Sequence, residues 1–249
     1  MENLTWDLKD PRNRIIVALD GFLTLQEVEA YVILLKDYVW GFKVGFQLIH
    51  TLGGPQVVWL IKKLGGRVFY DCKLKDTKDT MRFAAEGIAK LEVEIFNLHA
   101  DSTVKAMKAV QEICGNSIVA GVTVLTSLSE DDCQHVYKGN IEDTVERFAT
   151  DIITAGLPAV ICSAKEAEML KNIIRFKDLF TITPGIRPRE SDTNDQDPDR
   201  VRTPYEAIMG GSDMEVIGRP ILKPDTGTPV EAAIAIANEI QRALNDKAA

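Results

Sequence analysis

The sequence has few cysteines, no long apolar run and no excess of basic residues. Its four cysteines, at positions 72, 114, 133 and 162, form no CxxC pair and no Cys/His cluster, which argues against a zinc site or a redox motif. No apolar run approaches the roughly 20 residues that a membrane-spanning helix needs. The first 14 residues contain no apolar stretch typical of a secretory signal. We therefore expect a reduced, cytoplasmic enzyme without a metal, a cofactor or a membrane partner.

The charge balance is acidic, with a formal net charge of -8 over 249 residues. Nucleic acids and anionic membranes attract basic surfaces, so this balance argues against both kinds of partner. It leaves room for an anionic small substrate, because a local cluster of Lys and Arg can outweigh a distant surplus of Asp and Glu.

Short apolar runs alternate with longer amphipathic stretches along the chain. Most of the short runs are continuously apolar, as expected for parallel strands covered on both faces. Eight strand–helix units in about this length favour one α/β domain with a closed, parallel, eight-stranded sheet, a (β/α)8 barrel, over a doubly wound sheet. The expected strands are Arg14–Leu19, Gly41–Val44, Arg67–Leu74, Ile95–His99, Ser117–Thr126, Ala159–Ser163, Phe180–Gly185 and Met214–Arg219.

Several helix ends carry recognisable signals. A Thr followed three residues later by Glu predicts a capping box at Thr24, Thr203 and Thr228. Apolar residues at helical spacing from Ile141 to Ile153 predict another helix, with Gly156 after its end. No linker rich in Gly, Pro or Ser divides the chain. We therefore expect a single domain over residues 1–249, with residues 1–13 as an N-terminal extension.

One segment, residues 187–202, is polar, lacks periodicity and follows the seventh expected strand. A long loop inside a compact domain is usually disordered or functional. The active sites of barrels are built from the loops after the strands. We therefore expect residues 187–202 to form a lid loop over an active site.

Charged residues gather at the ends of the first three expected strands. Asp71 and Lys73 are two residues apart in one strand and therefore project to the same side. Lys43 lies within an apolar strand, Asp20 ends the first strand, and Asp76 follows the third. A single Asp or Lys at a strand end is often an ordinary solvated group. Several of them at neighbouring strand ends favour a set of carboxylates and ammonium groups around one pocket, where they neutralise one another.

The last two strands end in TPGIRP and VIGRP. Barrels frequently bind phosphate with the loops after these strands. Gly218 permits close approach of the backbone, and Arg219 and Arg187 offer charges that suit a phosphate. Gln196 in the expected lid could hydrogen-bond both a ring carbonyl and a phosphate. Thr126, at the end of the fifth expected strand, fits either a contact to a polar ring edge or an ordinary turn.

With these segments the sequence resembles the orotidine 5′-phosphate decarboxylase family, in its bacterial branch. The matching segments appear in family order and span nearly the whole chain. They are VALD at Asp20, FKVG at Lys43, DCKLKDTKDT from Asp71 to Thr80, VTVLTS at Thr126, TPGIRP at Arg187, DQ at Gln196 and VIGRP at Arg219. The chain departs from the family in having KDTKDT from Lys75, where HDIPNT is usual, and HADST from His99, where HASGG is usual. The two lost glycines change the backbone freedom of that loop.

The resemblance implies a dimeric TIM barrel that converts orotidine 5′-monophosphate (OMP) to UMP and CO2 in de novo pyrimidine biosynthesis, without metal or cofactor. It implies a catalytic array of Lys43, Asp71, Lys73 and Asp76, in which Lys73 protonates C6 of the pyrimidine. The homodimer would share its active sites, so that Asp76 and Thr80 contribute to the ribose contacts in the site of the partner subunit. Thr77 is a further implied substrate-binding residue. The implied substrate contacts are Asp20 and Lys43 to the ribose, Thr126 to the base, Arg187, Gly218 and Arg219 to the phosphate, and Gln196 to both phosphate and base.

Two alternatives remain open at this point. A sugar-phosphate decarboxylase of the same suprafamily, of the 3-keto-gulonate 6-phosphate type, would share the Asp-x-Lys-x-x-Asp pattern but use a divalent metal. The Gln196 loop and the TPGIRP segment favour the nucleotide. A catalytically silent, phosphate-binding barrel is the other alternative, because the loops after Asp76 and His99 are altered.

Overall fold

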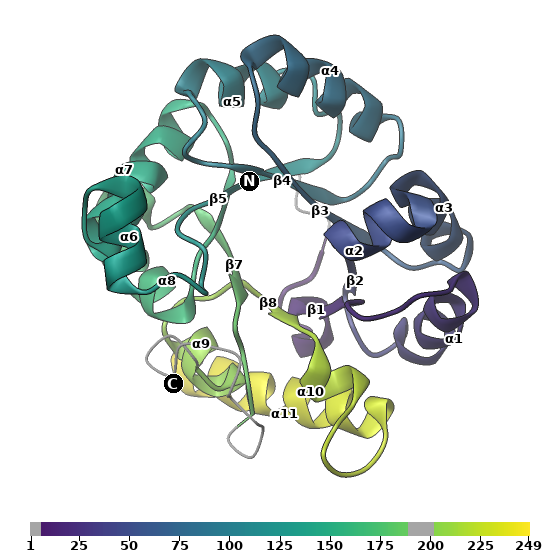
Figure 1. Cartoon of the computed structure of the whole chain (residues 1–249). Helices are drawn as coiled ribbons and strands as arrows, with labels where there is room; N and C mark the ends of the chain where they lie inside the picture. Colours follow the sequence, from purple (N-terminus) through teal and green to yellow (C-terminus); the bar gives the residue numbers. More distant parts are fainter. Residues whose placement is uncertain (1–5, 189–201) are drawn as a thin grey trace.

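The computed structural model describes residues 6–188 and 202–249. Eight parallel strands follow one another around a closed barrel, and the last strand pairs with the first (Figure 1). This arrangement confirms the expected (β/α)8 barrel. The strands are β1 (Ile15–Ala18), β2 (Gly41–Val44), β3 (Val68–Leu74), β4 (Ile95–His99), β5 (Ile118–Val122), β6 (Ala159–Ile161), β7 (Phe180–Pro184) and β8 (Met214–Ile217).

Helices surround the barrel on the outside (Figure 1). They are α1 (Leu25–Leu35), α2 (Phe46–Leu48), α3 (Gly54–Lys63), α4 (Lys78–Ala89), α5 (Val104–Gln111), α6 (Glu130–Tyr137), α7 (Ile141–Thr154), α8 (Ala164–Lys171), α9 (Pro204–Met209), α10 (Arg219–Leu222) and α11 (Pro229–Ala248). Shorter turns are the 3-10 helices η1 (Pro11–Arg14) and η3 (Ile174–Phe176) and the π-helical η2 (Ile49–Gly53). None of the described helices is both long enough and apolar enough to cross a membrane.

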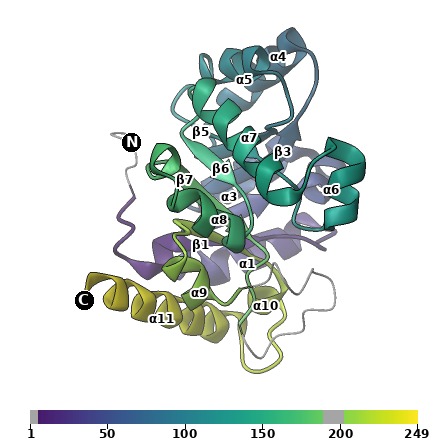
Figure 2. The ribbon, with the colours of Figure 1, turned by 90° about the vertical axis from the view of Figure 1, so that its left-hand side faces the viewer.

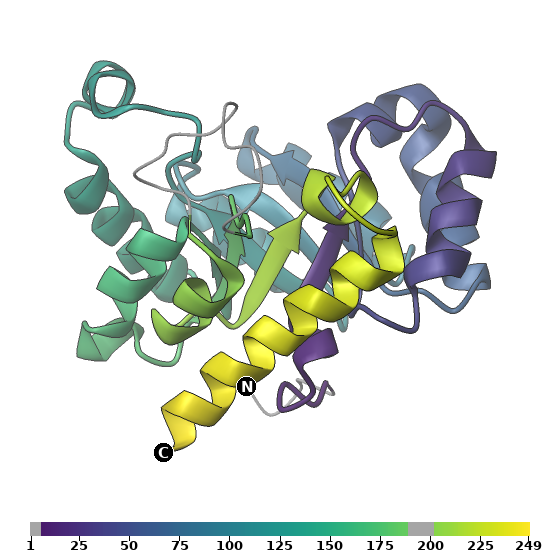
Figure 3. The ribbon, with the colours of Figure 1, turned by 90° about the horizontal axis from the view of Figure 1, so that it is seen from below.

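The two ends of the barrel differ. The C-terminal end of α11 lies at the end where the strands begin, whereas α10 lies at the end where they finish (Figure 3). The α6 helix also stands at this second end, as the two side views agree (Figures 2 and 3). The loops that follow the strands therefore meet at one end, where barrels place their active sites.

The helix signals in the sequence are confirmed. Thr24, Thr203 and Thr228 each form a capping box at the start of α1, α9 and α11. The α7 helix ends at Thr154, and the expected Gly156 follows the C-cap Ala155 with a φ of 79°, in the left-handed region. The N–H groups of Gly156 and Leu157 donate to the carbonyls of Ile153 and Ile152, which is the bonding pattern of a Schellman motif.

Some strands are shorter than expected from the sequence. The fifth strand was expected to reach Thr126 but ends at Val122, which pairs with Ile161, the last residue of β6. The chain then turns, so Thr126 lies beyond the strand. The eighth strand was expected to reach Arg219 but ends at Ile217, and Arg219 begins α10. After Val122 the apolar pattern continues through Val124 and Leu125, so composition alone overestimates the length of β5.

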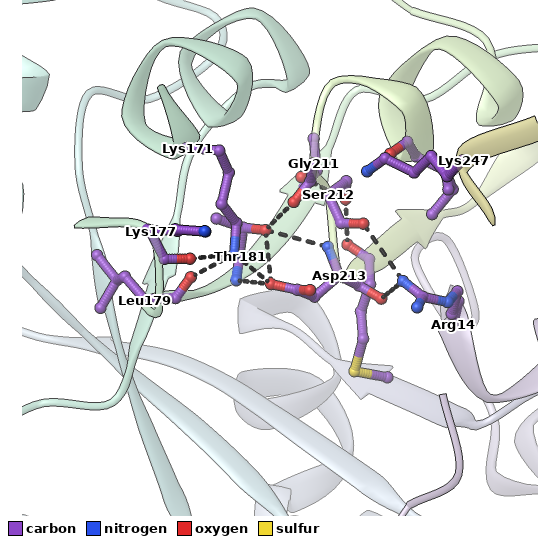
Figure 4. A network of polar contacts seen from close by, with 12 residues as sticks. Arg14, Lys171, Lys177, Leu179, Thr181, Gly211, Ser212, Asp213 and Lys247 are labelled. Atoms are coloured by element: carbon purple, nitrogen blue, oxygen red, sulfur yellow. Dashed lines mark hydrogen bonds and ion pairs between the residues drawn. The ribbon is translucent and has the colours of Figure 1, made fainter. Parts of the chain in front are cut away.

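A polar network joins elements at the end of the barrel where the strands begin (Figure 4). The Asp213 carboxylate accepts hydrogen bonds from the Thr181 backbone N–H at 2.9 Å, the Thr181 hydroxyl at 3.0 Å and the Lys171 ammonium at 2.9 Å. The Arg14 guanidinium donates to the backbone carbonyls of Ser212 at 3.4 Å and Asp213 at 3.0 Å. The network ties η1, α8 and β7 to the start of β8.

Glu215 lies near this network, on the outer face of β8, and is fully buried. Among the described residues, neither of its carboxylate oxygens has a hydrogen-bond partner. Burial, together with repulsion from Glu239, raises the pKa of Glu215 well above its ordinary value, and Arg14 opposes this only in part. The shift favours the protonated, neutral form of the Glu215 side chain.

Candidate active site

The barrel interior changes from apolar to charged along the strand direction. Every second residue of each strand faces the interior. At the beginning and middle of the strands these positions form a packed apolar cluster: Ile16, Ala18, Trp40, Phe69, Ile95, Ala120, Val122, Ala159, Ile161, Phe180, Ile182, Met214 and Val216. Further along or just beyond β1 to β4, interior positions carry charged or amide side chains instead, namely Asp20, Lys43, Asp71, Lys73 and Asn97. The packed cluster thus forms a floor beneath a polar group of side chains.

Asp71 is the centre of this polar group. Its Oδ1 lies 2.6 Å from the Lys73 ammonium, and its Oδ2 lies 3.2 Å from the Lys43 ammonium. Lys43 also pairs with Asp20, at 3.1 Å between Nζ and Oδ1. The structure therefore brings together four of the residues that the sequence pattern grouped.

The charges in this cluster stabilise one another. Burial raises the pKa of Asp71, but the neighbouring Lys43 and Lys73 ammonium groups and the hydrogen bonds from Lys73 and Asn97 outweigh it, and the pKa lies below its ordinary value. Burial likewise lowers the pKa of Lys43, and the Asp71 and Asp20 carboxylates more than reverse this, so the pKa is raised. Asp71 and Lys43 are therefore both ionised at neutral pH in a largely desolvated place.

The end of β3 is irregular. Tyr70 pairs with Phe96 of β4, and the next pair is Leu74 with Leu98, so three residues of β3 lie opposite one residue of β4. Lys73, within this bulge, has a φ of 45°, which is uncommon for a residue other than glycine. The bulge directs the Lys73 ammonium toward Asp71 and leaves it 5.3 Å from the centre of the Phe46 ring.

Asn97 is a member of this site that the sequence analysis missed. It is 1% exposed, and its side-chain amide donates to Asp71 Oδ1 at 2.7 Å and accepts from the Lys73 backbone N–H at 2.7 Å. The available signal was a lone amide at an interior position of the apolar strand IFNLH. His99, two residues later, is half-buried, and burial lowers its pKa, which keeps the imidazole neutral at neutral pH.

A cavity of about 230 Å³ opens beside the charged cluster. One side of it carries charged and amide groups, including Lys43, Asp71 and Lys73, and the other side is mainly apolar. Thr126 also lines this cavity, at the turn after β5. The complete lining is Lys43, Phe69, Asp71, Lys73, Asn97, Val122, Val124, Leu125, Thr126, Ile161, Cys162, Pro184 and Val216.

Three other predicted residues lie outside this cavity. Asp76, Thr77 and Thr80 are exposed around the start of α4, and none of them contributes to the lining. Asp76 accepts a hydrogen bond from the Thr77 backbone N–H at 2.6 Å, and the hydroxyls of Thr77 and Thr80 lie 3.0 Å apart.

The predicted phosphate-binding residues are only partly described. Arg219 is the exposed first residue of α10, and Gly218 before it makes no side-chain cap. Arg187 is buried. Its guanidinium donates to the Ile186 carbonyl at 2.9 Å, and its backbone N–H donates to the Arg202 carbonyl at 3.0 Å. Gln196, and most of the expected lid at residues 187–202, lies outside the described residues.

The remaining chemistry of the site is limited. Burial raises the pKa of the Cys72 thiol to about 12, so it stays protonated at neutral pH. Within residues 6–188 and 202–249, no three or more His, Cys, Asp or Glu side chains are grouped so that they could hold a metal ion. The cluster instead presents fixed, paired charges beside an apolar wall, which can stabilise charge that develops on a bound molecule.

Comparison with known proteins identifies relatives along most of the chain. The model of the orotidine 5′-phosphate decarboxylase / HUMPS family matches residues 13–236. Orotidine 5′-phosphate decarboxylase from Streptococcus thermophilus (strain ATCC BAA-491 / LMD-9) is 36% identical over 243 residues, which cover 94% of this chain and 99% of that protein. The enzyme of the same name from Syntrophotalea carbinolica is 38% identical over 249 residues, with 96% and 99% covered.

Solved structures agree with these relatives. The crystal structure of orotidine 5′-phosphate decarboxylase from Lactobacillus acidophilus superposes with a TM-score of 0.76 at 28% identity, covering 92% of this chain and 99% of that one. The structure of the enzyme from Pyrococcus horikoshii OT3, at 22% identity and a TM-score of 0.71, shares the fold and covers 91% and 99% of the two chains.

Proposed function

The chain belongs to the orotidine 5′-phosphate decarboxylase / HUMPS family, and on this basis we propose that it converts OMP to UMP and CO2 in de novo pyrimidine biosynthesis in the cytoplasm. The observation that carries the proposal is the Lys43–Asp71–Lys73 cluster beside an apolar cavity wall. A partly buried ammonium held by a carboxylate is suited to a reaction that builds negative charge on carbon.

The reaction breaks the bond between C6 of the pyrimidine and its carboxyl carbon. The bonding electron pair stays on C6, and CO2 leaves. No carbonyl is placed to accept these electrons, so the enzyme must stabilise the charge where it forms. In the proposed mechanism the Lys73 ammonium lies beside C6 and then transfers a proton to it. Solvent returns a proton to Lys73 afterwards.

Asp71 has two roles in this scheme. Its carboxylate pairs with the Lys73 ammonium at 2.6 Å and holds it in place beside C6. It also lies on the side of the cavity where the substrate carboxylate would approach. The repulsion between these two negative charges would be relieved when CO2 departs. The apolar wall excludes water and strengthens both electrostatic effects.

The rest of the nucleotide is bound by groups further from C6. We assign Asp20 and Lys43 to the ribose hydroxyls and Thr126 to the base. Arg187, Gly218 and Arg219 are assigned to the phosphate, and Gln196 would bridge phosphate and base. The position of Arg219 at the start of α10, directly after β8, supports the phosphate assignment, because a barrel phosphate site frequently uses this loop. Binding energy from the phosphate can close the lid at residues 187–202 and thereby raise the rate at C6.

The site is proposed to be completed by a second copy of the chain. Asp76 and Thr80 are exposed and are not part of the lining of their own chain's cavity, as expected for residues that serve the partner subunit. Phe46, on α2, is 51% exposed, and both Trp59 on α3 and Phe83 on α4 are 60% exposed, so large apolar side chains occupy the same side of the barrel. A homodimer would bury these rings and bring the partner's Asp76 to the Lys73 end of the site.

The deciding experiment is a direct assay of purified protein with OMP. Loss of the orotate absorbance together with release of one CO2 per UMP formed is the expected result. Orotidine, which lacks the phosphate, serves as the control substrate and should react far more slowly. A protein that binds OMP without consuming it would instead be a silent phosphate-binding barrel, and the proposal would be wrong.

A further inference from the structure

We propose that Asn97 is a positioning residue whose side-chain amide holds the β3 bulge in place and thereby aims the Lys73 ammonium at the reacting carbon. The role of Lys73 in this statement rests on the proposed decarboxylation. The position of Lys73 and its dependence on Asn97 rest on geometry alone.

The Asn97 amide makes two hydrogen bonds, one as a donor and one as an acceptor. Its NH2 group donates to Asp71 Oδ1 at 2.7 Å, and its oxygen accepts from the Lys73 backbone N–H at 2.7 Å. The carboxylate accepts and the backbone N–H donates, so the two partners fix the orientation of the amide. The Asn97 side chain therefore links the Asp71 carboxylate to the Lys73 backbone, and these two residues form the 2.6 Å ion pair.

The bulge needs such a link. Between the Tyr70–Phe96 and Leu74–Leu98 pairs, β3 has three residues where β4 has only Asn97. The regular ladder cannot serve three residues with one, and the Asn97 amide oxygen serves the Lys73 N–H in its place. Lys73 is also held at a φ of 45°. A left-handed conformation is strained for a residue other than glycine and persists only where the surroundings enforce it.

Charged groups surround Asn97, so the charge of the side chain at this position matters. Asp71 and Lys73 on β3 contact it directly. Lys43 on β2 and Asp20 after β1 extend the cluster, and His99 lies two residues along β4. From β5 the cavity lining near the cluster is the apolar Val122. A negative charge at position 97 would therefore meet the Asp71 carboxylate first.

This arrangement predicts distinct behaviour for two substitutions. Asn97→Ala removes both hydrogen bonds, and kcat should fall at least about tenfold while KM changes less than about threefold, because the phosphate and ribose contacts are elsewhere. Asn97→Asp has the same shape. When ionised, Asp at this position repels Asp71, and when protonated it can donate to Asp71 and accept from Lys73 as the amide does.

The pH profile therefore separates positioning from a merely structural role. Relative to the wild type at each pH, the activity of Asn97→Asp should rise at least about tenfold between about pH 8 and about pH 5.5, since burial and Asp71 both raise the pKa of the new carboxyl. Asn97→Ala should show no such recovery. The control is Ser117→Ala, which removes another buried hydrogen bond, to the Val93 carbonyl at 2.6 Å, and should leave kcat and the pH profile unchanged.

A crystal structure of Asn97→Ala completes the test independently of activity. If Lys73 leaves the left-handed region and its ammonium moves from Asp71, the inference holds, even if wild-type protein fails to decarboxylate OMP and the proposed function is wrong. If the wild type is active and Asn97→Ala retains both its kcat and the Lys73 conformation, the inference is overturned. A flat relative pH profile for Asn97→Asp would overturn it as well.

Discussion

The Lys73 ammonium lies 2.6 Å from the Asp71 carboxylate at the place where β3 departs from a regular strand. The bulge of β3 and the left-handed backbone of Lys73 bring them together. The ion pair therefore depends on backbone geometry as well as on charge. Its chemical importance can be measured by removing one member at a time.

Lys73→Ala should abolish decarboxylation while the barrel still folds. Loss of both the proton donor and the charge beside C6 is expected to lower kcat at least about a thousandfold. Steady-state turnover of OMP measures the loss, and far-ultraviolet circular dichroism checks the fold. Lys105→Ala, at an exposed lysine of α5, is the matched control and should keep wild-type turnover. Near-normal activity of Lys73→Ala would remove this residue from its assigned role.

Arg219→Ala should weaken binding of the nucleotide specifically. A charge-assisted hydrogen bond to phosphate is worth about 1.5–3 kcal/mol, so KM for OMP should rise about tenfold to a hundredfold. Turnover of orotidine, which has no phosphate, should hardly change. Both values come from parallel kinetics on the two substrates. An equal loss on both would mean that Arg219 does not contact the phosphate.

Two inactive variants should restore activity when they are mixed. In a shared site, Lys73→Ala and Asp76→Ala damage different subunits, so one site of each mixed dimer is intact. Random exchange of subunits would leave about a quarter of all sites intact. Activity is measured after the two proteins have been mixed and allowed to exchange. If no activity returns although mixed dimers are present, Asp76 acts within its own chain or not at all.

Exhaustive treatment with a chelator should leave turnover unchanged. The carboxylate of Asp71 already pairs with two ammonium groups and accepts a hydrogen bond from an amide, so its oxygens are committed. The measurement is the rate of OMP loss before and after chelation, followed by addition of Mg²⁺ or Zn²⁺. Activity that disappears and returns with metal would favour a metal-dependent decarboxylase of the same suprafamily.

Glu215 makes the stability of the barrel depend on pH. Its pKa in the folded protein lies well above the ordinary value of 4.5, so between these two pKa values the native state binds a proton that the unfolded state releases. This carboxyl therefore lowers the free energy of unfolding as pH rises, by about 1.4 kcal/mol per pH unit within that window. Glu215→Gln, which stays neutral, should lack this decline.

Urea unfolding of both proteins at a series of pH values above 4.5 measures this difference. The advantage of Glu215→Gln should grow with pH. Glu29→Gln, at an exposed position of α1, is the control and should follow the wild type. Parallel curves for Glu215→Gln and the wild type would mean that the carboxyl is not protonated in the folded state.

Much of the site could be predicted because alternation along a strand is a local property. Asp71 and Lys73 share a face whatever the rest of the chain does, and a lysine within an apolar strand, such as Lys43, needs a buried partner. The structure confirms this grouping. The predicted capping boxes also depend only on neighbours in the sequence, and all three formed.

The features that could not be predicted depend on contacts between distant segments. The β3 bulge exists because Asn97 of the neighbouring strand replaces a missing backbone partner for Lys73, and no periodicity in β3 reports this. The end of β5 at Val122 follows from the end of the short strand β6, although Val124 and Leu125 continue the apolar pattern. The roles of Asp76 and Gln196 remain predictions.

Closure of the barrel has a consequence for how the protein is made. The first strand has β8 as one of its two neighbours, and Arg14 bonds to carbonyls that lie 198 and 199 positions later in the sequence. Pairings of such separation form slowly, because a long segment of chain must first be ordered. During synthesis at the ribosome, β1 therefore has an unpaired edge until most of the polypeptide has emerged. The pairing of β1 with β8 is then the last strand pairing that becomes possible, because β8 is the last strand to be synthesised.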